Sequence, residues 1–114
     1  MSGTLKRISG PAYLAAAAAD IYTPPASTIY TVIRHIHIAN VTAGAVTFTL
    51  YIGATGGSAG GTELEKGYSV AANGEYDRYF GGQGLKMIST DFLSGLASAG
   101  SSLTITVIGE QVVV

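Results

Sequence analysis

The pattern of residues 28–50, TIYTVIRHIHIANVTAGAVTFTL, limits the folds open to this chain more than any other feature. Side chains of a strand point alternately to two faces, so a two-residue period is typical of half-buried strands. One predicted face of the first strand carries Tyr30, Val32, Ile36 and Ile38, and the other carries Thr31, Ile33, His35 and His37. The apolar face of the second strand carries Val46, Phe48, Leu50 and Ile52. We predict a hairpin of these two strands, joined by a turn at residues 40–44.

Arg34 interrupts the apolar face of the first predicted strand. A buried charge without a partner is costly. We therefore expect Arg34 to lie near a margin of the sheet or to meet a carboxylate.

The rest of the chain divides into short strand-like segments separated by glycine, proline, asparagine and serine. Further strands are predicted at residues 4–8, 63–72, 75–80, 85–88 and 92–97, and from Leu103 onward, with a turn at Asn73-Gly74. Residues 13–22 include five consecutive alanines, which suit a helix. The segment is short and bounded by Gly10-Pro11 and Pro24-Pro25, so an extended conformation is favoured. Residues 53–62 are rich in glycine and are predicted to be a hairpin tip, because they lack the ending of a phosphate loop.

About eight short strands without a clear amphipathic helix indicate an all-β fold, a single antiparallel β-sandwich of jelly-roll or Ig-like type, with a small barrel as the alternative. The length of 114 residues fits one domain over residues 1–114. Residues 1–11 and 110–114 are candidate N-terminal and C-terminal arms, because a terminal strand can add to a neighbour's sheet. Lys6-Arg7 before the alanines imitates a secretion signal, but Gly10-Pro11 breaks the apolar run, and we expect no cleavage.

The composition excludes several classes of function. Charged residues are 11% of the chain, against about 25% in typical soluble domains. We infer that much of the surface is hidden against copies of the chain or a large partner; the alternative is a surface of Ser, Thr, Gly and Ala. A net charge of -1 argues against nucleic-acid binding, and no run approaches the roughly 20 apolar residues that span a bilayer, so no membrane partner is expected. Cysteine is absent, which excludes disulfides and thiolate sites within these residues.

His35 and His37 point the same way from a strand and are the only histidines. A zinc site takes at least three protein ligands, so Asp or Glu would have to complete one. We interpret the pair as polar side chains on the outer or interface face and predict no metal or cofactor. Two carboxylate pairs, at residues 63 and 65 and at residues 75 and 77, lie beside Lys66 and Arg78 and are interpreted as solvated ion pairs. We predict no catalytic residue, and therefore no enzyme.

Residues 76–80 crowd three aromatic rings around Asp77 and Arg78. Aromatic residues and arginine are enriched at protein interfaces. The same residues could instead close one end of the sandwich or stack on sugar rings. The predicted interface residues are Lys6, Arg7, Tyr76, Arg78, Tyr79, Phe80, Val112, Val113 and Val114.

Three segments resemble the small β-sandwich virion proteins of tailed bacteriophages, in which an LYTVP turn leads into a strand ending IHIAN and a late G…L…GD.L segment follows. The matching residues are 21–26 (IYTPPA), 32–40 (VIRHIHIAN) and 46–52 (VTFTLYI), followed by Gly84-Leu85 and Asp91-Phe92-Leu93. The chain departs from the pattern at Thr23-Pro24-Pro25, where Val-Pro is usual, and at Thr90, which replaces a glycine.

The resemblance implies a non-enzymatic virion component, made in the host cytoplasm. The first expectation is a capsid decoration or cement protein that binds the phage major capsid protein and associates with itself, with a trimer favoured. The second is a tail, neck or baseplate component of the same fold. A carbohydrate-binding module for host attachment is the alternative from another class.

Overall fold

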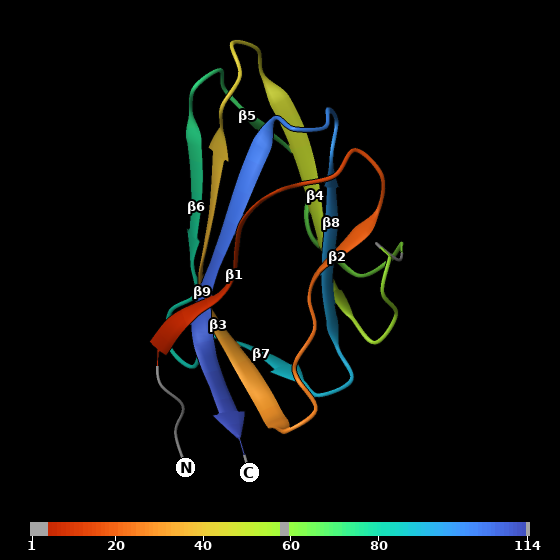
Figure 1. Ribbon diagram of the computed structural model, residues 1–114, viewed down its shortest axis with the longest axis vertical. Helices are drawn as coiled ribbons and strands as arrows, with labels where there is room; N and C mark the ends of the chain where they lie inside the picture. The colour runs from red at the N-terminus through yellow and green to blue at the C-terminus, as the bar shows by residue number, and fades with distance from the viewer. Residues whose placement is uncertain (1–4, 58–59, 114) are drawn as a thin grey trace.

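The computed structural model describes residues 5–57 and 60–113, which form two antiparallel β-sheets packed face to face (Figure 1). These residues contain nine strands and no helix, and therefore no helix that could cross a membrane. The strands are β1 (Leu5–Tyr13), β2 (Ala19–Tyr22), β3 (Thr28–Asn40), β4 (Val46–Gly53), β5 (Glu63–Val70), β6 (Glu75–Tyr79), β7 (Leu85–Ile88), β8 (Phe92–Ala97) and β9 (Leu103–Val113). The predicted antiparallel sandwich is confirmed, and β2 is the strand beyond the expected eight.

The first sheet has the order β1-β9-β3-β6, and β7 pairs with β3 beyond the end of β6. The second sheet has the order β2-β8-β4-β5. Hydrogen bonds join the neighbouring edges of the two sheets. Ser9 on β1 donates to the carbonyl of Ile21 on β2 at 3.0 Å, and Tyr76 on β6 donates to Glu65 on β5 at 2.8 Å. Each side of the sandwich is therefore closed by a polar contact.

Both strands predicted within residues 28–50 are confirmed, but their pairing as a hairpin is wrong. β3 pairs with β6, β7 and β9, whereas β4 pairs with β5 and β8 in the other sheet. Each strand has one apolar face and buries it by facing the opposite sheet, so Ile36 and Ile38 of β3 and Phe48 and Leu50 of β4 share one core. The intervening turn therefore carries the chain across the sandwich. The turn at Asn73-Gly74 also crosses, from β5 to β6.

Asn40, the last residue of β3, holds this crossing together with a buried side chain. Its Nδ2 donates to the carbonyls of Gly44 at 2.8 Å and Val70 at 3.0 Å. Its Oδ1 accepts from the amide of Thr42 at 2.9 Å and from the Thr42 hydroxyl at 2.7 Å. The four bonds join the end of β3, the turn and the end of β5. An amide side chain suits this position because it offers donors and an acceptor together.

The predicted faces of β3 are right in its second half and wrong in its first. Ile36 and Ile38 are buried as predicted, but Thr31 and Ile33 are the buried residues before them. The register against β9 slips between Ile33 and His35, so the inward side changes from odd to even positions. Such a β-bulge inserts one extra residue into a strand and reverses its alternation. Tyr30 is therefore half-buried on the outer face instead of lying in the core.

Arg34 lies at the bulge and meets a carboxylate, as predicted. Its Nε donates to Oε2 of Glu110 at 2.8 Å, and its Nη1 donates to the carbonyl of Gly82 at 3.0 Å. Gly109 lies opposite on β9, where an added Cβ would collide with the carbonyl oxygen of Val32. The bulge therefore fits β9 only because residue 109 has no side chain.

The structure also bears on the predictions for residues 1–22, for the glycine-rich segment 53–62 and for the two terminal segments. Residues 13–22 form no helix, as predicted, but they are not extended throughout: a bend at residues 16–17 separates Tyr13, the end of β1, from β2. The glycine-rich segment connects the antiparallel pair β4 and β5. The first strand was expected to end before Gly10-Pro11, but β1 continues through these residues to Tyr13. Gly10 makes this possible because it adopts a φ of +80° and lies against the Ile105 carbonyl, where the Cβ of any other residue would collide. Residues 5–13 and 103–113 pair with neighbouring strands, while residues 1–4 and 114 lie outside the described residues.

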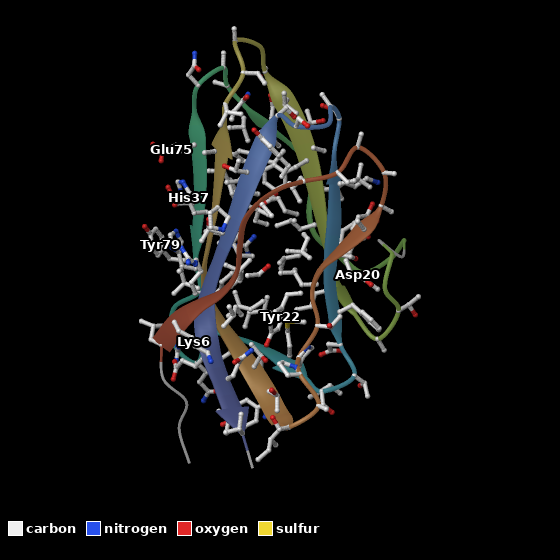
Figure 2. All side chains as sticks on the ribbon, viewed as in Figure 1. Lys6, Asp20, Tyr22, His37, Glu75 and Tyr79 are labelled. Carbon is white, nitrogen blue, oxygen red and sulfur yellow. The ribbon has the colours of Figure 1, made fainter. Side chains whose placement is uncertain are left out.

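A buried polar link joins the two sheets near the other end of β3. The Tyr22 hydroxyl on β2 lies 2.9 Å from Thr31 Oγ1 and accepts a hydrogen bond from Gln111 Nε2 at 2.8 Å. Tyr22 lies between the sheets in Figure 2. Buried polar groups are costly unless they are paired. The hydrogen bonds among Tyr22, Thr31 and Gln111 therefore specify how the two sheets align and also stabilise their contact.

Replacing Asn40 by alanine should destabilise the fold by about 2–3 kcal/mol, because the Val70 and Gly44 carbonyls lose a buried donor. Urea unfolding followed by circular dichroism measures this loss. The control is Asn73→Gly, at an exposed turn position with a φ of 55°, which should change stability by less than about 0.5 kcal/mol. Equal losses for the two variants would contradict the role given to Asn40.

Replacing Gly109 by alanine should cost about 2–3 kcal/mol, because the new methyl group forces β9 away from the bulge of β3. Gly44→Ala is the matched control, since an added Cβ there meets no atom within 4 Å. Thermal unfolding of both variants tests the close approach. If Gly109→Ala were as stable as Gly44→Ala, β3 and β9 would have space for a side chain at position 109, and the close approach would be contradicted.

Candidate functional site

His35 and His37 on β3 and Asp77 on β6 form a cluster on the outer face of the first sheet. His37 pairs directly with Asp77, and His35 pairs with Tyr79, in the antiparallel register of β3 and β6. Oδ1 of Asp77 lies 2.7 Å from His35 Nε2 and 2.7 Å from His37 Nδ1. One carboxylate oxygen thus accepts hydrogen bonds from two imidazoles. We call these three residues the histidine cluster.

Two neighbouring side chains restrict the rings of the histidine cluster. The Tyr79 ring stacks on His35 with centroids 4.1 Å apart and planes 2° from parallel. Glu75 Oε1 lies 3.5 Å from Nε2 of His37, the nitrogen that does not face Asp77. Figure 2 shows His37, Glu75 and Tyr79 projecting from the β6 side of the sandwich, away from the core. The polar groups are therefore accessible from solvent while the rings keep their orientation.

Hydrogen bonds favour the ionised form of Asp77. Those from His37 and His35 hold the pKa of the Asp77 carboxyl below its usual value, which favours the ionised carboxylate. On the opposite face of β6, burial and the hydrogen bond to Glu65 raise the pKa of the Tyr76 hydroxyl. The outer face of β6 thus carries negative charge, and its inner face holds a neutral phenol.

The histidine cluster also has the composition of a metal ligand set. One atom from each of the three residues can be chosen so that all lie within 4.8 Å of one another. Imidazole nitrogen with carboxylate oxygen is a combination that zinc and similar ions accept. The sequence interpretation placed the histidines on an outer face, where they do lie, but it did not join Asp77 to them, because that contact depends on the register of β6 against β3.

The predicted interface residues of β6 separate onto two faces. Tyr79 points outward and is 72% exposed, whereas Tyr76 is 8% exposed and lies in the core against Phe48. Arg78 faces inward with Tyr76, lies 3.4 Å from Glu65 and sits over the ring of Phe80. Tyr76, Arg78 and Phe80 therefore close the β5–β6 side of the sandwich, the packing role that the sequence left open.

The remaining predicted interface residues lie on the other side of the first sheet. Lys6 and Arg7 are exposed on the edge strand β1 and pair with Gly109 and Ile108. Val112 is buried and Val113 is exposed at the end of β9, and Val114 lies outside the described residues. Since β1 and β6 are opposite edges of this sheet, the predicted set is not one surface.

Several exposed apolar side chains were missed by the sequence reasoning. Leu5, Ile29 and Ile88 are each at least half exposed. They come from β1, β3 and β7, at the end of the first sheet where Thr28 pairs with Val113 and Tyr30 pairs with Ile88. The sequence shows that these residues are apolar. It does not show that their side chains point outward, because this direction depends on the bulge and on strand pairings between distant residues.

A small hollow lies between β1 and β2. It holds about 120 Å³ and is lined by Ser9, Ala12, Tyr13, Leu14, Ala15, Ala19, Asp20, Ile21, Gly95 and Ile105. Two of its polar side chains already have partners: Ser9 donates to the Ile21 carbonyl, and Asp20 accepts from the amide of Gly57 at 3.0 Å. The hollow offers little unpaired polarity to a ligand.

No protein-family model and no curated protein matches this chain. Among solved structures, the chain is similar to one reported with Bacillus endospore appendages, described as a novel family of disulfide-linked pili. The TM-score is 0.52 and the identity 18%, over 100% of this chain and 91% of that one. At this identity the likeness supports the sandwich fold alone.

Two other solved structures align less well. One is PirA, with a TM-score of 0.47 and 17% identity over 91% of this chain and 93% of that one. The other is a pentameric capsid protein from metagenomic phage sequences, with a TM-score of 0.42 and 13% identity over 94% of this chain and 61% of that one. Scores at this level carry no argument about function.

Alanine substitutions at the two tyrosines of β6 should have very different effects on stability. Tyr76→Ala empties a core position and removes the bond to Glu65, so we expect a loss of about 3 kcal/mol or more. Tyr79→Ala removes only an exposed ring and should cost less than about 1 kcal/mol. Denaturant unfolding of the pair measures both values. A costly Tyr79→Ala with a mild Tyr76→Ala would reverse the assignment of the two faces.

Proposed function

We propose that this chain is a non-enzymatic structural component of a tailed-phage virion, and specifically a head decoration protein that binds the major capsid lattice. The sequence resemblance over residues 21–26, 32–40 and 46–52 supports the virion assignment. The observation that carries the proposal is the apolar end of the first sheet, formed by Leu5, Ile29, Ile88 and Val113.

The apolar end is supported as a contact by the exposure of its side chains, which lie around the end of the sheet and not on one face, since Ile88 pairs with Tyr30 and Val113 pairs with the buried Thr28. Its four side chains are between 42% and 59% exposed and come from four different strands. Soluble monomers usually keep contiguous apolar patches small, and large ones mark interaction sites. Lys6 and Arg7 follow Leu5 on β1 and would place positive charge at the rim of this contact.

The proposed action is stabilisation by binding. A protein that binds the assembled, expanded shell and not its dissociated subunits stabilises that shell in proportion to its occupancy. A trimer of the chain would match a threefold position of the lattice and would present three copies of the apolar end at once. No covalent chemistry is required of any residue.

Other assignments make different demands on the structure. A tail, neck or baseplate component would use the same fold and differ in the particle fraction where it is found. A sugar-binding platform needs accessible rings, and of the three aromatic residues of 76–80 only Tyr79 faces outward. Cross-linking like that of disulfide-linked pili needs cysteine, which these 114 residues do not contain.

Ile88→Asp should weaken binding to expanded empty shells by more than about tenfold, or abolish it. The shells are those of the phage that encodes the chain. The reason is that the new carboxylate at position 88 would lose its hydration in the contact with the shell. Cosedimentation with the shells measures binding, and the shell melting temperature measures cementing. Val41→Asp is the matched control, since Ile88 and Val41 are both 53% exposed but lie at opposite ends of β3.

Two results would count against the proposal. Wild-type protein that is absent from purified heads but present in tails would move it to the second virion role. Equal binding by the Ile88→Asp and Val41→Asp variants would remove the apolar end as the contact. Light scattering at micromolar concentration tests the trimer separately, and a stable mass of three chains is the expected value.

A further inference from the structure

The outer face of β3 and β6 carries a set of donors that the proposed virion role does not use. Nε2 of His35, Nδ1 of His37 and Oδ1 of Asp77 converge there from two adjacent strands. We propose that these three residues bind one divalent transition-metal ion of the zinc class. The inference is independent of the capsid assignment.

The geometry of the cluster is close to that of a bound site. Zinc lies about 2.0–2.2 Å from nitrogen and oxygen ligands, so neighbouring ligands of a tetrahedral ion are about 3.3 Å apart. Asp77 Oδ1 is now 2.7 Å from each of the two histidine nitrogens. An ion replacing the two shared protons needs each pair to open by about 0.6 Å, which side-chain rotation supplies because Asp77 is only partly covered. The ligand nitrogens of the two histidines, which lie within 4.8 Å of one another, must at the same time approach by up to about 1.5 Å.

The strands hold the ligands in position before any ion arrives. His37 and Asp77 are directly paired in the β3–β6 ladder, and β3 is an inner strand of the sheet. Stacking on Tyr79 fixes the plane of the His35 ring. Glu75 lies 3.5 Å from Nε2 of His37, the nitrogen left over when Nδ1 binds the ion. A carboxylate on the second nitrogen of a ligating histidine orients the ring and raises its basicity.

The donor types define the class of ion. Imidazole nitrogen favours zinc, cobalt, nickel and copper, whereas magnesium and calcium require sets of oxygen ligands. Three protein ligands leave at least one coordination position, which faces solvent on the outside of the sheet and would be taken by water. Because the chain contains two histidines and no cysteine, no second set of imidazole or thiolate ligands can be formed from these residues.

The test is titration of the untagged, chelator-treated protein with Zn²⁺, followed by calorimetry and by nitrogen-15 NMR of the histidine rings. We expect one ion per chain and a change in the ring nitrogen signals at His35 Nε2 and His37 Nδ1. With two histidines in the chain, each ring signal is assigned by a single His35→Ala variant. Magnesium at the same concentration should leave both rings unchanged.

Matched variants identify the ligands. His35→Ala and Asp77→Asn should each weaken Zn²⁺ binding by more than about tenfold. Loss of a residue that only hydrogen-bonds to a metal ligand already weakens affinity by about tenfold or more, and loss of a ligand itself should cost at least as much. Glu63→Gln removes a carboxylate from β5, in the other sheet, and should bind like wild type. Zn²⁺ that leaves both rings of the wild-type protein unchanged would overturn the proposal, as would full affinity in the Asp77→Asn variant. The ring spectra of the wild type decide the question even if a variant folds poorly.

Discussion

The β-bulge at Arg34 determines which side of β3 faces the core, and most of the surface chemistry depends on it. Thr31 and Ile33 point inward before the bulge, so an unbroken strand would bury His35 and His37 as well. The extra residue turns both imidazoles outward and places Ile36 and Ile38 in the core. The cost of the irregular ladder is offset locally, because Arg34 pairs with Glu110 and the backbone of Gly109 can approach closely. Core packing and the histidine cluster thus follow from the same local slip.

The two sheets are tied together by side-chain amides and hydroxyls at both ends of β3 as well as by apolar packing. At one end Asn40 connects the crossing turn to β5, and at the other Tyr22 joins Thr31 and Gln111. Apolar burial is not directional, so it favours a sandwich without choosing how the sheets are offset. Buried polar groups do choose, because each must meet its partner. This explains why a chain with few charges can still specify one alignment.

Local signals predicted most of the strands but not β2 or the full length of β1, and distant contacts explain most of what they missed. The pattern of residues 28–50 locates β3 and β4, but two strands with one apolar face each suit a hairpin and a crossing equally well. The phase of β3 depends on Gly109, which follows it by about seventy residues and carries no pattern of its own. The faces of Tyr76 and Tyr79 could have been assigned from the period of two, since they are three positions apart. Joining Asp77 to the histidines required the register of β6, which the turn chemistry does not specify.

The surface of the first sheet has two chemically different regions. Polar and charged groups gather where β3 meets β6, in the histidine cluster, and the Arg34–Glu110 pair lies between this cluster and the apolar end, because Glu110 pairs with Leu5. Exposed apolar side chains gather at the other end, from Leu5 to Val113. Ile29 and His37 are eight positions apart on β3, about 26 Å along a strand. A partner that covers the apolar end can therefore leave the histidine cluster in water, so assembly and ion binding are separable properties of one sheet.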